Sequence, residues 1–153
     1  MMPANFVERG RRRAGAGFTL IEVMIVIVVV SILVAIALPS YESSMQKGRR
    51  TDAKSALLDV AGKQEQYMLD RGTYTNDMTD LGFAADPMVS EEQHYTLDAT
   101  DCNGGTADLD RCYLITATPR AGSPQVDDAR CTSFKLDSNG LKTATGSDID
   151  SCW

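Results

Sequence analysis

An apolar run of 21 residues, from Phe18 to Leu38, is the feature that most constrains this chain. A helix of this run, at about 1.5 Å per residue, spans roughly 30 Å, the thickness of the hydrocarbon core of a membrane. Three polar residues interrupt it: Thr19, Glu22 and Ser31. A carboxylate in a spanning helix costs about 2.5 to 3.5 kcal/mol at the centre and less near an edge. Glu22 therefore needs a cationic partner.

A basic leader precedes the apolar run. Its charged residues are four arginines against one acid: Arg9, Arg11, Arg12, Arg13 and Glu8. Positive flanks stay on the cytoplasmic side of a membrane. We therefore expect everything after Pro39 to face the opposite compartment.

Two ordinary explanations compete for this segment. A cleavable secretory signal has an apolar stretch of about 7 to 15 residues and a small-x-small site, which Ala35 to Ala37 matches. The run is longer than that and contains an acid near its start. A plain single-span anchor explains the length and the leader, but it gives no reason for Glu22.

Cleavage between Gly17 and Phe18 would supply the missing cation. It would remove the arginines and leave a free amine on Phe18, four residues before Glu22. The amine of one copy and the carboxylate of a neighbouring copy could then pair inside the membrane. Such pairing would satisfy the acid and make the helix an assembly surface.

The segment Gly17-Phe18-Thr19-Leu20-Ile21-Glu22-Val23, with the leader, the apolar run and Pro39, resembles the class III signal of type IV pilins. The resemblance implies that a prepilin peptidase cuts after Gly17 and methylates the amine of Phe18. It also implies that Glu22 neutralises the N-terminus of an adjacent subunit during filament assembly. The helix-bending proline of the family falls on Pro39.

A second helical pattern follows Pro39. Its apolar side recurs every three or four residues, at Ala53, Ala56, Leu57, Val60, Ala61, Gln64, Tyr67 and Met68. Arg71 followed by Gly72 indicates the helix end, because glycine readily takes the left-handed conformation there. We expect one helix of roughly 50 residues, from Phe18 to about Arg71.

The remaining chain predicts an antiparallel sheet. Strand-like segments cover residues 94–99, 111–118, 130–137 and 141–145, after a connecting loop with at most one helical turn. Asp137-Ser138-Asn139-Gly140 is a hairpin signal, because Asn-Gly tolerates positive dihedral angles. A sheet of about four strands on the helical stripe predicts an α+β fold, which the resemblance makes a pilin fold.

The expected organisation is therefore a cleaved leader, an assembly segment and one globular domain. The leader covers residues 1–17 and the transmembrane half of the helix covers residues 18–39. The domain covers residues 40–153, with the second half of the helix in 40–71, the connecting loop in 72–93, and the sheet and disulfide loops in 94–153.

All four cysteines, Cys102, Cys112, Cys131 and Cys152, follow the apolar run, which agrees with an oxidising compartment. Three pairings are possible. We favour Cys131 with Cys152, which ties the terminus to the penultimate strand, and Cys102 with Cys112, which closes a short loop. The C-terminal part, from Tyr113 to the final Cys-Trp, resembles minor pilins of the PilE type, to whose pattern the pair Cys102 and Cys112 is an addition.

Charge and motifs argue against catalysis and nucleic-acid binding. The formal charge of −6 becomes −9 without the leader, so the mature protein should repel nucleic acid. No phosphate-binding loop, nucleophile with a base, or metal-ligand cluster is evident, so we expect no enzyme and no cofactor. Calcium is a minor alternative near the oxygen-rich positions Asp98, Asp101, Asn103, Asp108 and Asp110.

Three functions stay open. The first is a structural, minor subunit of a type IV pilus, which the resemblance associates with motility, adhesion or DNA uptake. Its partners would be other major and minor pilins, the prepilin peptidase and the assembly machinery of the inner membrane. The domain would be periplasmic and then extracellular, in a Gram-negative bacterium. The second is a pseudopilin of a type II secretion system, and the third is a membrane-anchored enzyme or binding domain.

Overall fold

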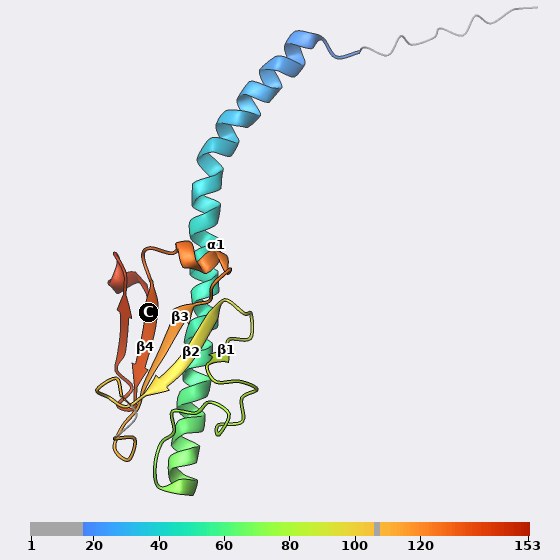
Figure 1. Ribbon diagram of the computed structural model, residues 1–153. Coiled ribbons are helices and arrows are strands. Elements are labelled where there is room, and N and C mark those ends of the chain that lie inside the picture. The colour runs from blue at the N-terminus through green and yellow to red at the C-terminus, as the bar shows by residue number, and fades with distance from the viewer. Residues whose placement is uncertain (1–16, 106–107) are drawn as a thin grey trace, which may run out of the picture. The chain divides into compact units, whose positions relative to one another are not determined.

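The computed structural model describes residues 17–105 and 108–153, so the charged residues of the leader lie outside the described part. The chain divides into two compact units, Met1–Ser40 and Tyr41–Trp153, and each is described here by itself. One helix of 52 residues, α1 (Leu20–Arg71), contributes to both units and contains Pro39 (Figure 1). It begins two residues later than predicted and ends at the predicted Arg71. Gly72 follows it with a φ of 76°, as expected of a helix C-terminus.

The described part of the first unit is the apolar half of α1. Every described side chain up to Ser40 is exposed. Its mean hydropathy reaches 3.1 over 18 residues, and by length and composition α1 is the one helix among the described residues that could cross a membrane. A helix that is apolar on all sides and has no protein cover needs lipid or other helices around it.

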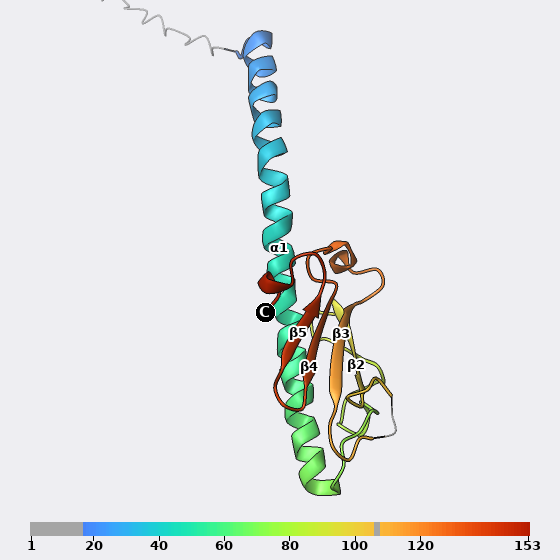
Figure 2. The same cartoon turned by 90° about the vertical axis from the view of Figure 1, so that its left-hand side faces the viewer.

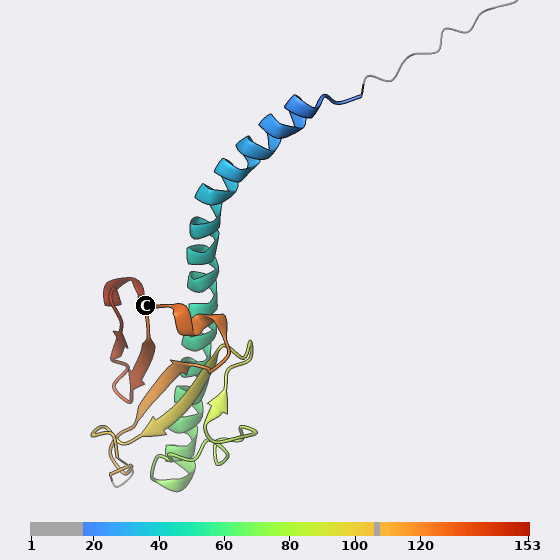
Figure 3. The same cartoon turned by 45° about the horizontal axis from the view of Figure 1, so that its top comes forward.

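The second unit contains a five-stranded antiparallel sheet, confirming the predicted α+β architecture. Its strands run in the spatial order of the sequence, from β1 at one edge to β5 at the other (Figures 1 and 3). Their bounds are β1 (Met88–Val89), β2 (Tyr95–Thr100), β3 (Leu114–Pro119), β4 (Ser133–Asp137) and β5 (Lys142–Thr145). Two short 3-10 helices, η1 (Pro124–Asp127) and η2 (Ile149–Ser151), lie before β4 and after β5.

The fifth strand corrects the expectation of about four. Strand β1 lies inside the segment predicted to be a connecting loop, and it pairs Met88 with Leu97 and Val89 with Thr96. Two residues are too few to produce an alternating pattern, and Pro87 directly before them argued against a strand. Edge strands tolerate both features, because half of their backbone groups face away from the sheet.

The predicted β4–β5 hairpin forms with a different turn. Gly140 has a φ of 78°, whereas Asn139 is not among the residues with positive φ. The Gly140 amide donates to the Asp137 carbonyl at 3.0 Å. The Asp137 side chain in turn accepts the amides of Asn139 and Leu141 at 2.9 and 2.8 Å. This longer loop places one glycine in the left-handed region and needs no left-handed asparagine.

The core lies between the second half of α1 and one face of the sheet (Figure 2). Alternate strand residues point into it, as the register Leu97↔Ala117↔Phe134 shows. On the helix, the residues of the predicted stripe between Ala53 and Gln64 are buried, apart from a half-buried Ala61. Apolar burial on this face therefore sets the packing of helix on sheet.

A buried ion pair joins α1 to the segment before β4. Arg50 is 2% exposed and Asp128 is 1% exposed. Two nitrogens of Arg50 donate to the two Asp128 oxygens at 2.7 and 2.9 Å, a bidentate geometry. Asp128 also accepts from Gln125 Nε2 at 2.7 Å and from the Cys131 amide at 3.4 Å. The pair thus links the helix with η1 and the start of the C-terminal disulfide loop.

Two further buried polar residues of α1 form hydrogen bonds to neighbouring loops, mostly to their backbone groups. Asp52 accepts the Ser90 hydroxyl at 2.6 Å and the amides of Glu92 and His94 at 3.2 and 3.3 Å. Gln64 donates to the Thr75 carbonyl at 2.5 Å and accepts the Thr75 amide at 3.1 Å. These bonds satisfy backbone groups that have no strand partner.

We predict that Asp128→Ala destabilises the domain by about 3 to 5 kcal/mol, because it leaves the Arg50 guanidinium buried without an anion. Chemical denaturation of the full chain in detergent, followed by circular dichroism, measures the loss. Asp127→Ala, at the exposed neighbouring position, serves as the control and should change little. Equal stability of the two variants would contradict a structural role for the pair.

Candidate functional site

Thr19 fixes the start of α1. Its hydroxyl oxygen accepts the Glu22 backbone amide at 3.3 Å, and its carbonyl accepts the Val23 amide at 3.3 Å. Thr19 is therefore the N-cap, and Glu22 is the third helical residue. This role of Thr19 was not predicted. The signal was present, because Thr-x-x-Glu before an apolar run is the capping-box pattern.

Ser31 is the second polar residue of the apolar run. Its hydroxyl donates to the Ile27 carbonyl at 2.7 Å, one helical turn earlier. The bond satisfies the hydroxyl inside its own helix, so Ser31 can enter an apolar environment at small cost. Two of the three polar side chains in the run thus find a partner within α1.

The Glu22 carboxylate is the exception. Among residues 17–105 and 108–153, no hydrogen-bond donor or cation engages its oxygens. Its surroundings are apolar, because Glu22 lines a shallow groove of about 290 Å³ with Phe18, Val23, Val26 and Ile27. An unpaired carboxylate between apolar side chains is costly wherever water is excluded. The described residues therefore leave this acid without a partner of its own.

Gly17 and Phe18 lie directly before the helix and are accessible. Both precede the N-cap, and 83% of Phe18 is exposed. Among the described residues, a side chain added at Gly17 would meet nothing within 4 Å, so packing against them does not require glycine there. An exposed peptide bond outside regular structure is open to a protease. Pro39 lies within α1, and the bend expected there stays a prediction.

The structure pairs the cysteines in the way that the sequence analysis favours. Cys102 joins Cys112 and Cys131 joins Cys152, with Cα atoms 5.8 and 5.7 Å apart. The second bridge ties the C-terminal end to the segment before β4, where Arg50 also donates to the Ser151 carbonyl at 3.4 Å. The C-terminal loop is thus held by a disulfide and by the helix.

The oxygen-rich segment considered for calcium is spread out in the described residues. Asp98 is an exposed residue of β2, and partial desolvation of its carboxyl group, together with the Asp86 charge, raises its pKa. Asp101 instead accepts the amides of Asn103 and Gly105 at 2.8 and 2.7 Å, which shapes the loop. Outside residues 1–16 and 106–107, no three potential metal ligands gather.

The chain matches two family models. Residues 39–135 match the family described as "Type IV minor pilin ComP, DNA uptake sequence receptor". Residues 12–38 match the prokaryotic N-terminal methylation motif. The chain belongs to the type IV pilin family. The resemblance inferred from residues 17–23 and Pro39 is confirmed, and the family is one of structural pilins and not of enzymes.

The individual relatives of this pilin belong to two kinds of assembly, pili or fimbriae and a type II secretion system. The type IV major pilin PilA of Myxococcus xanthus is 29% identical over 80% of this chain and 52% of its own length. The fimbrial protein EcpC of Eikenella corrodens is 34% identical over 69% of this chain and 63% of its own. The type II secretion system core protein G of Pseudomonas aeruginosa is 35% identical over 46% of this chain and 50% of its own. The match thus spans about half to two thirds of these relatives.

We predict that Thr19→Val weakens the first turn of the pilin helix by about 1 kcal/mol, or about fivefold in local opening, because the N-cap acceptor is lost. Amide hydrogen exchange at Glu22, measured by NMR in micelles, reports the opening. Thr19→Ser keeps the hydroxyl and should match the unmodified chain. Unchanged protection in the valine variant would show that the bond is unimportant.

Proposed function

We propose that this chain is a minor subunit of a type IV pilus, held in the inner membrane by α1, cleaved after Gly17, and drawn into the filament by Glu22. The observation that carries the proposal is the Glu22 carboxylate, which has no partner among the described residues although it lies in an apolar groove. Thr19 and Ser31 are satisfied within the helix, so Glu22 alone among the polar residues of the run requires another molecule.

Cleavage supplies the partner in this proposal. A free amine on Phe18 lies four residues before the acid, and a neighbouring copy displaced along the helix axis can bring its own amine to Glu22. In a medium of low dielectric constant, opposite charges attract far more strongly than in water. Pairing therefore favours filament entry over dispersal of single copies in lipid. Apolar packing of the surrounding helices excludes water from the pair.

The compartment follows from charge and cysteine chemistry. The arginine-rich leader favours a cytoplasmic N-terminus, and both disulfides favour an oxidising space beyond the membrane. We place the domain in the periplasm of a Gram-negative bacterium before assembly and outside the cell afterwards. Prepilin peptidase, the inner-membrane assembly machinery and other pilins would be the partners. Motility, adhesion or DNA uptake would be the role of the fibre.

A pseudopilin of a type II secretion system is the second candidate. The similarity to core protein G favours it, and the same Glu22 argument applies to both assemblies. The longer match to the minor-pilin family, from residue 39 to 135, supports the pilus. Recovery of the chain in sheared surface fibres, rather than only in membranes, would decide between them.

We propose no direct contact with nucleic acid, although the family description names a DNA uptake sequence receptor. The formal charge without the leader is −9, and a protein of that charge repels a polyanion at long range. The buried Arg50 is also unavailable, because Asp128 engages it. A contribution of this subunit to DNA uptake would then pass through the fibre.

We predict that Gly17→Val keeps the leader on the chain, because the peptidase would no longer find glycine before the cut. Intact-mass measurement of membrane protein should show an N-terminal Phe18 with one added methyl in the unmodified chain and an uncut leader in the variant. Ala14→Val, within the leader, is the control and should be processed normally. An uncut leader in the unmodified chain would refute the processing step.

We predict that Glu22→Gln reduces the number of copies in sheared fibres by about tenfold or more, because an amide cannot pair with the Phe18 amine as a carboxylate does. Membrane insertion and cleavage should persist. Glu42→Gln, which neutralises another exposed acid of α1, should leave fibre content unchanged. Normal fibre entry by the Glu22 variant would instead favour a simple membrane anchor.

A further inference from the structure

A groove between α1 and η1, here called the α1–η1 groove, carries charges of both signs. Its volume is about 290 Å³. A hollow of this size is at the small end of ligand pockets, so it suits a compact group rather than an extended molecule. Its lining combines apolar side chains with one cation and two acids, and includes Tyr41, Glu42, Met45, Arg49, Pro124 and Asp127.

The charged side chains of the α1–η1 groove do not neutralise one another. Arg49 is half-buried, whereas Glu42 and Asp127 are exposed. Within residues 17–105 and 108–153, none of these three side chains takes part in an ion pair or a hydrogen bond. A guanidinium and carboxylates that line one hollow without pairing suit a ligand that itself carries both charges.

Buried contacts next to the groove hold its two walls. Arg50 and Asp128, the chain neighbours of Arg49 and Asp127, form the bidentate ion pair between α1 and the residue after η1. Gln125 of η1 also donates to a backbone carbonyl of α1 at 3.4 Å. The opposite charges of the groove are therefore positioned by their neighbours and not by each other.

The groove begins just after the apolar half of α1 in the sequence. Tyr41 follows Leu38 by three residues and Arg49 by eleven, about 5 and 17 Å along the helix. The headgroup layer of a bilayer is about 5 to 8 Å deep, and tyrosine is enriched in it. Helical side chains lean towards the N-terminus, so the long side chain of Arg49 reaches back towards this layer.

We propose that the α1–η1 groove binds the headgroup of phosphatidylethanolamine, a zwitterionic phospholipid with a primary amine. The Arg49 guanidinium donates to the phosphate oxygens, and the Asp127 carboxylate accepts from the ammonium group. Tyr41 and Met45 lie against the apolar stem of the lipid. This inference rests on the membrane insertion of α1 in the proposed function, and the lipid holds the domain of an unassembled subunit against the membrane surface.

The charges of the groove favour this lipid over two others. An anionic headgroup brings no cation for Asp127, and the chain without its leader has a formal charge of −9, which anionic membranes repel. The quaternary ammonium of phosphatidylcholine has no N–H to donate to a carboxylate. A primary amine next to a phosphate satisfies both signs of charge.

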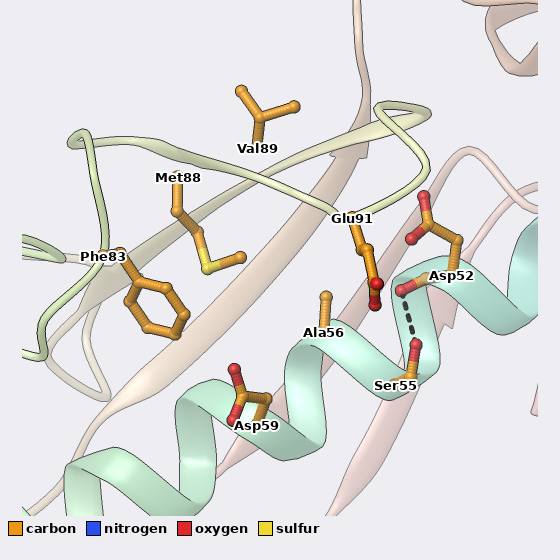
Figure 4. A pocket seen from close by; sticks show the side chains of 8 residues that line it. All are labelled: Asp52, Ser55, Ala56, Asp59, Phe83, Met88, Val89 and Glu91. Carbon is orange, nitrogen blue, oxygen red and sulfur yellow. Dashed lines mark hydrogen bonds between the residues drawn. The ribbon is translucent and has the colours of Figure 1, made fainter.

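The pocket beside β1 provides a contrast. Its volume is about 340 Å³, and its charged lining residues are Asp52, Asp59 and Glu91, with no cation among the residues that line it. Figure 4 shows Asp59 on the helix, across the space from the Phe83 and Met88 side chains. Acids alone offer nothing to a phosphate, so Asp59 is a control for Asp127.

Native mass spectrometry of the full chain in detergent, titrated with single lipids, measures the preference. We expect phosphatidylethanolamine to bind about tenfold more tightly than phosphatidylcholine or phosphatidylglycerol, as one charge-assisted hydrogen bond implies. Arg49→Gln and Asp127→Asn should each remove the preference. Lys47→Gln and Asp59→Asn make the same changes at exposed positions outside the groove and should keep it.

Carbodiimide coupling locates the lipid on the unmodified chain, so it does not depend on the folding of a variant. In bilayers, the reagent joins the headgroup amine to a carboxylate as an amide, with loss of water. Peptide mapping should place this adduct on Asp127 and not on Asp59. Equal binding of the three lipids, or an adduct on Asp59 as abundant as that on Asp127, would overturn the headgroup site.

Lipid binding and filament entry fail separately. A chain that is cleaved and enters fibres but shows no lipid preference would overturn the headgroup site and leave the proposed function intact. A chain that binds phosphatidylethanolamine through Arg49 and Asp127 but never appears in sheared fibres would support the site and overturn the proposed function.

Discussion

One continuous helix must satisfy two different environments, and the rest of this protein depends on how it does so. The first half of α1 is apolar on every side and has no protein cover, whereas the second half buries one stripe under a sheet. A helix can carry both because its backbone hydrogen bonds are internal and stay satisfied in lipid and in water alike. What changes along the chain is the side-chain pattern alone.

Polar residues on α1 follow the same division. In the apolar half, Thr19 and Ser31 are satisfied locally, whereas the Glu22 carboxylate has no partner among the described residues. In the second half, buried Arg50 and Gln64 reach across to loops that have no regular pairing. The helix therefore organises the irregular parts of the domain by hydrogen bonds, while the strands pack on it by apolar contact.

The sequence predicted the features that repeat along the chain. The apolar run, the stripe from Ala53 to Gln64 and the alternating strands β2 to β5 each span several residues, so their periods are readable. Strand β1 was not predicted, because its two residues are too few to show an alternating pattern. The pairing of Arg50 with Asp128 was not predicted, because the two residues lie 78 positions apart in the chain and no local pattern encodes such a pair. Arg50 itself occupies a stripe position, three residues before Ala53, and that placement was the available clue.

Only part of the candidate site at the start of α1 was predicted from the sequence. Glu22 stands out because a lone acid in an apolar run is anomalous in any fold. Thr19 was not predicted to be the N-cap because the helix was expected to begin at Phe18, whereas it begins at Leu20. The pocket beside β1 could not be predicted, since Asp59 and Glu91 come to line one space only through the packing of the connecting loop on α1.

The central claim is an ion pair between copies, and a density map of the purified fibre tests it most directly. Electron cryomicroscopy at side-chain resolution should show the Glu22 carboxylate within about 4 Å of the Phe18 amine of a neighbouring subunit, as an ion pair requires. It should also show the chain beginning at Phe18. A Glu22 side chain that faces lipid or bulk water, with no amine near it, would contradict the account.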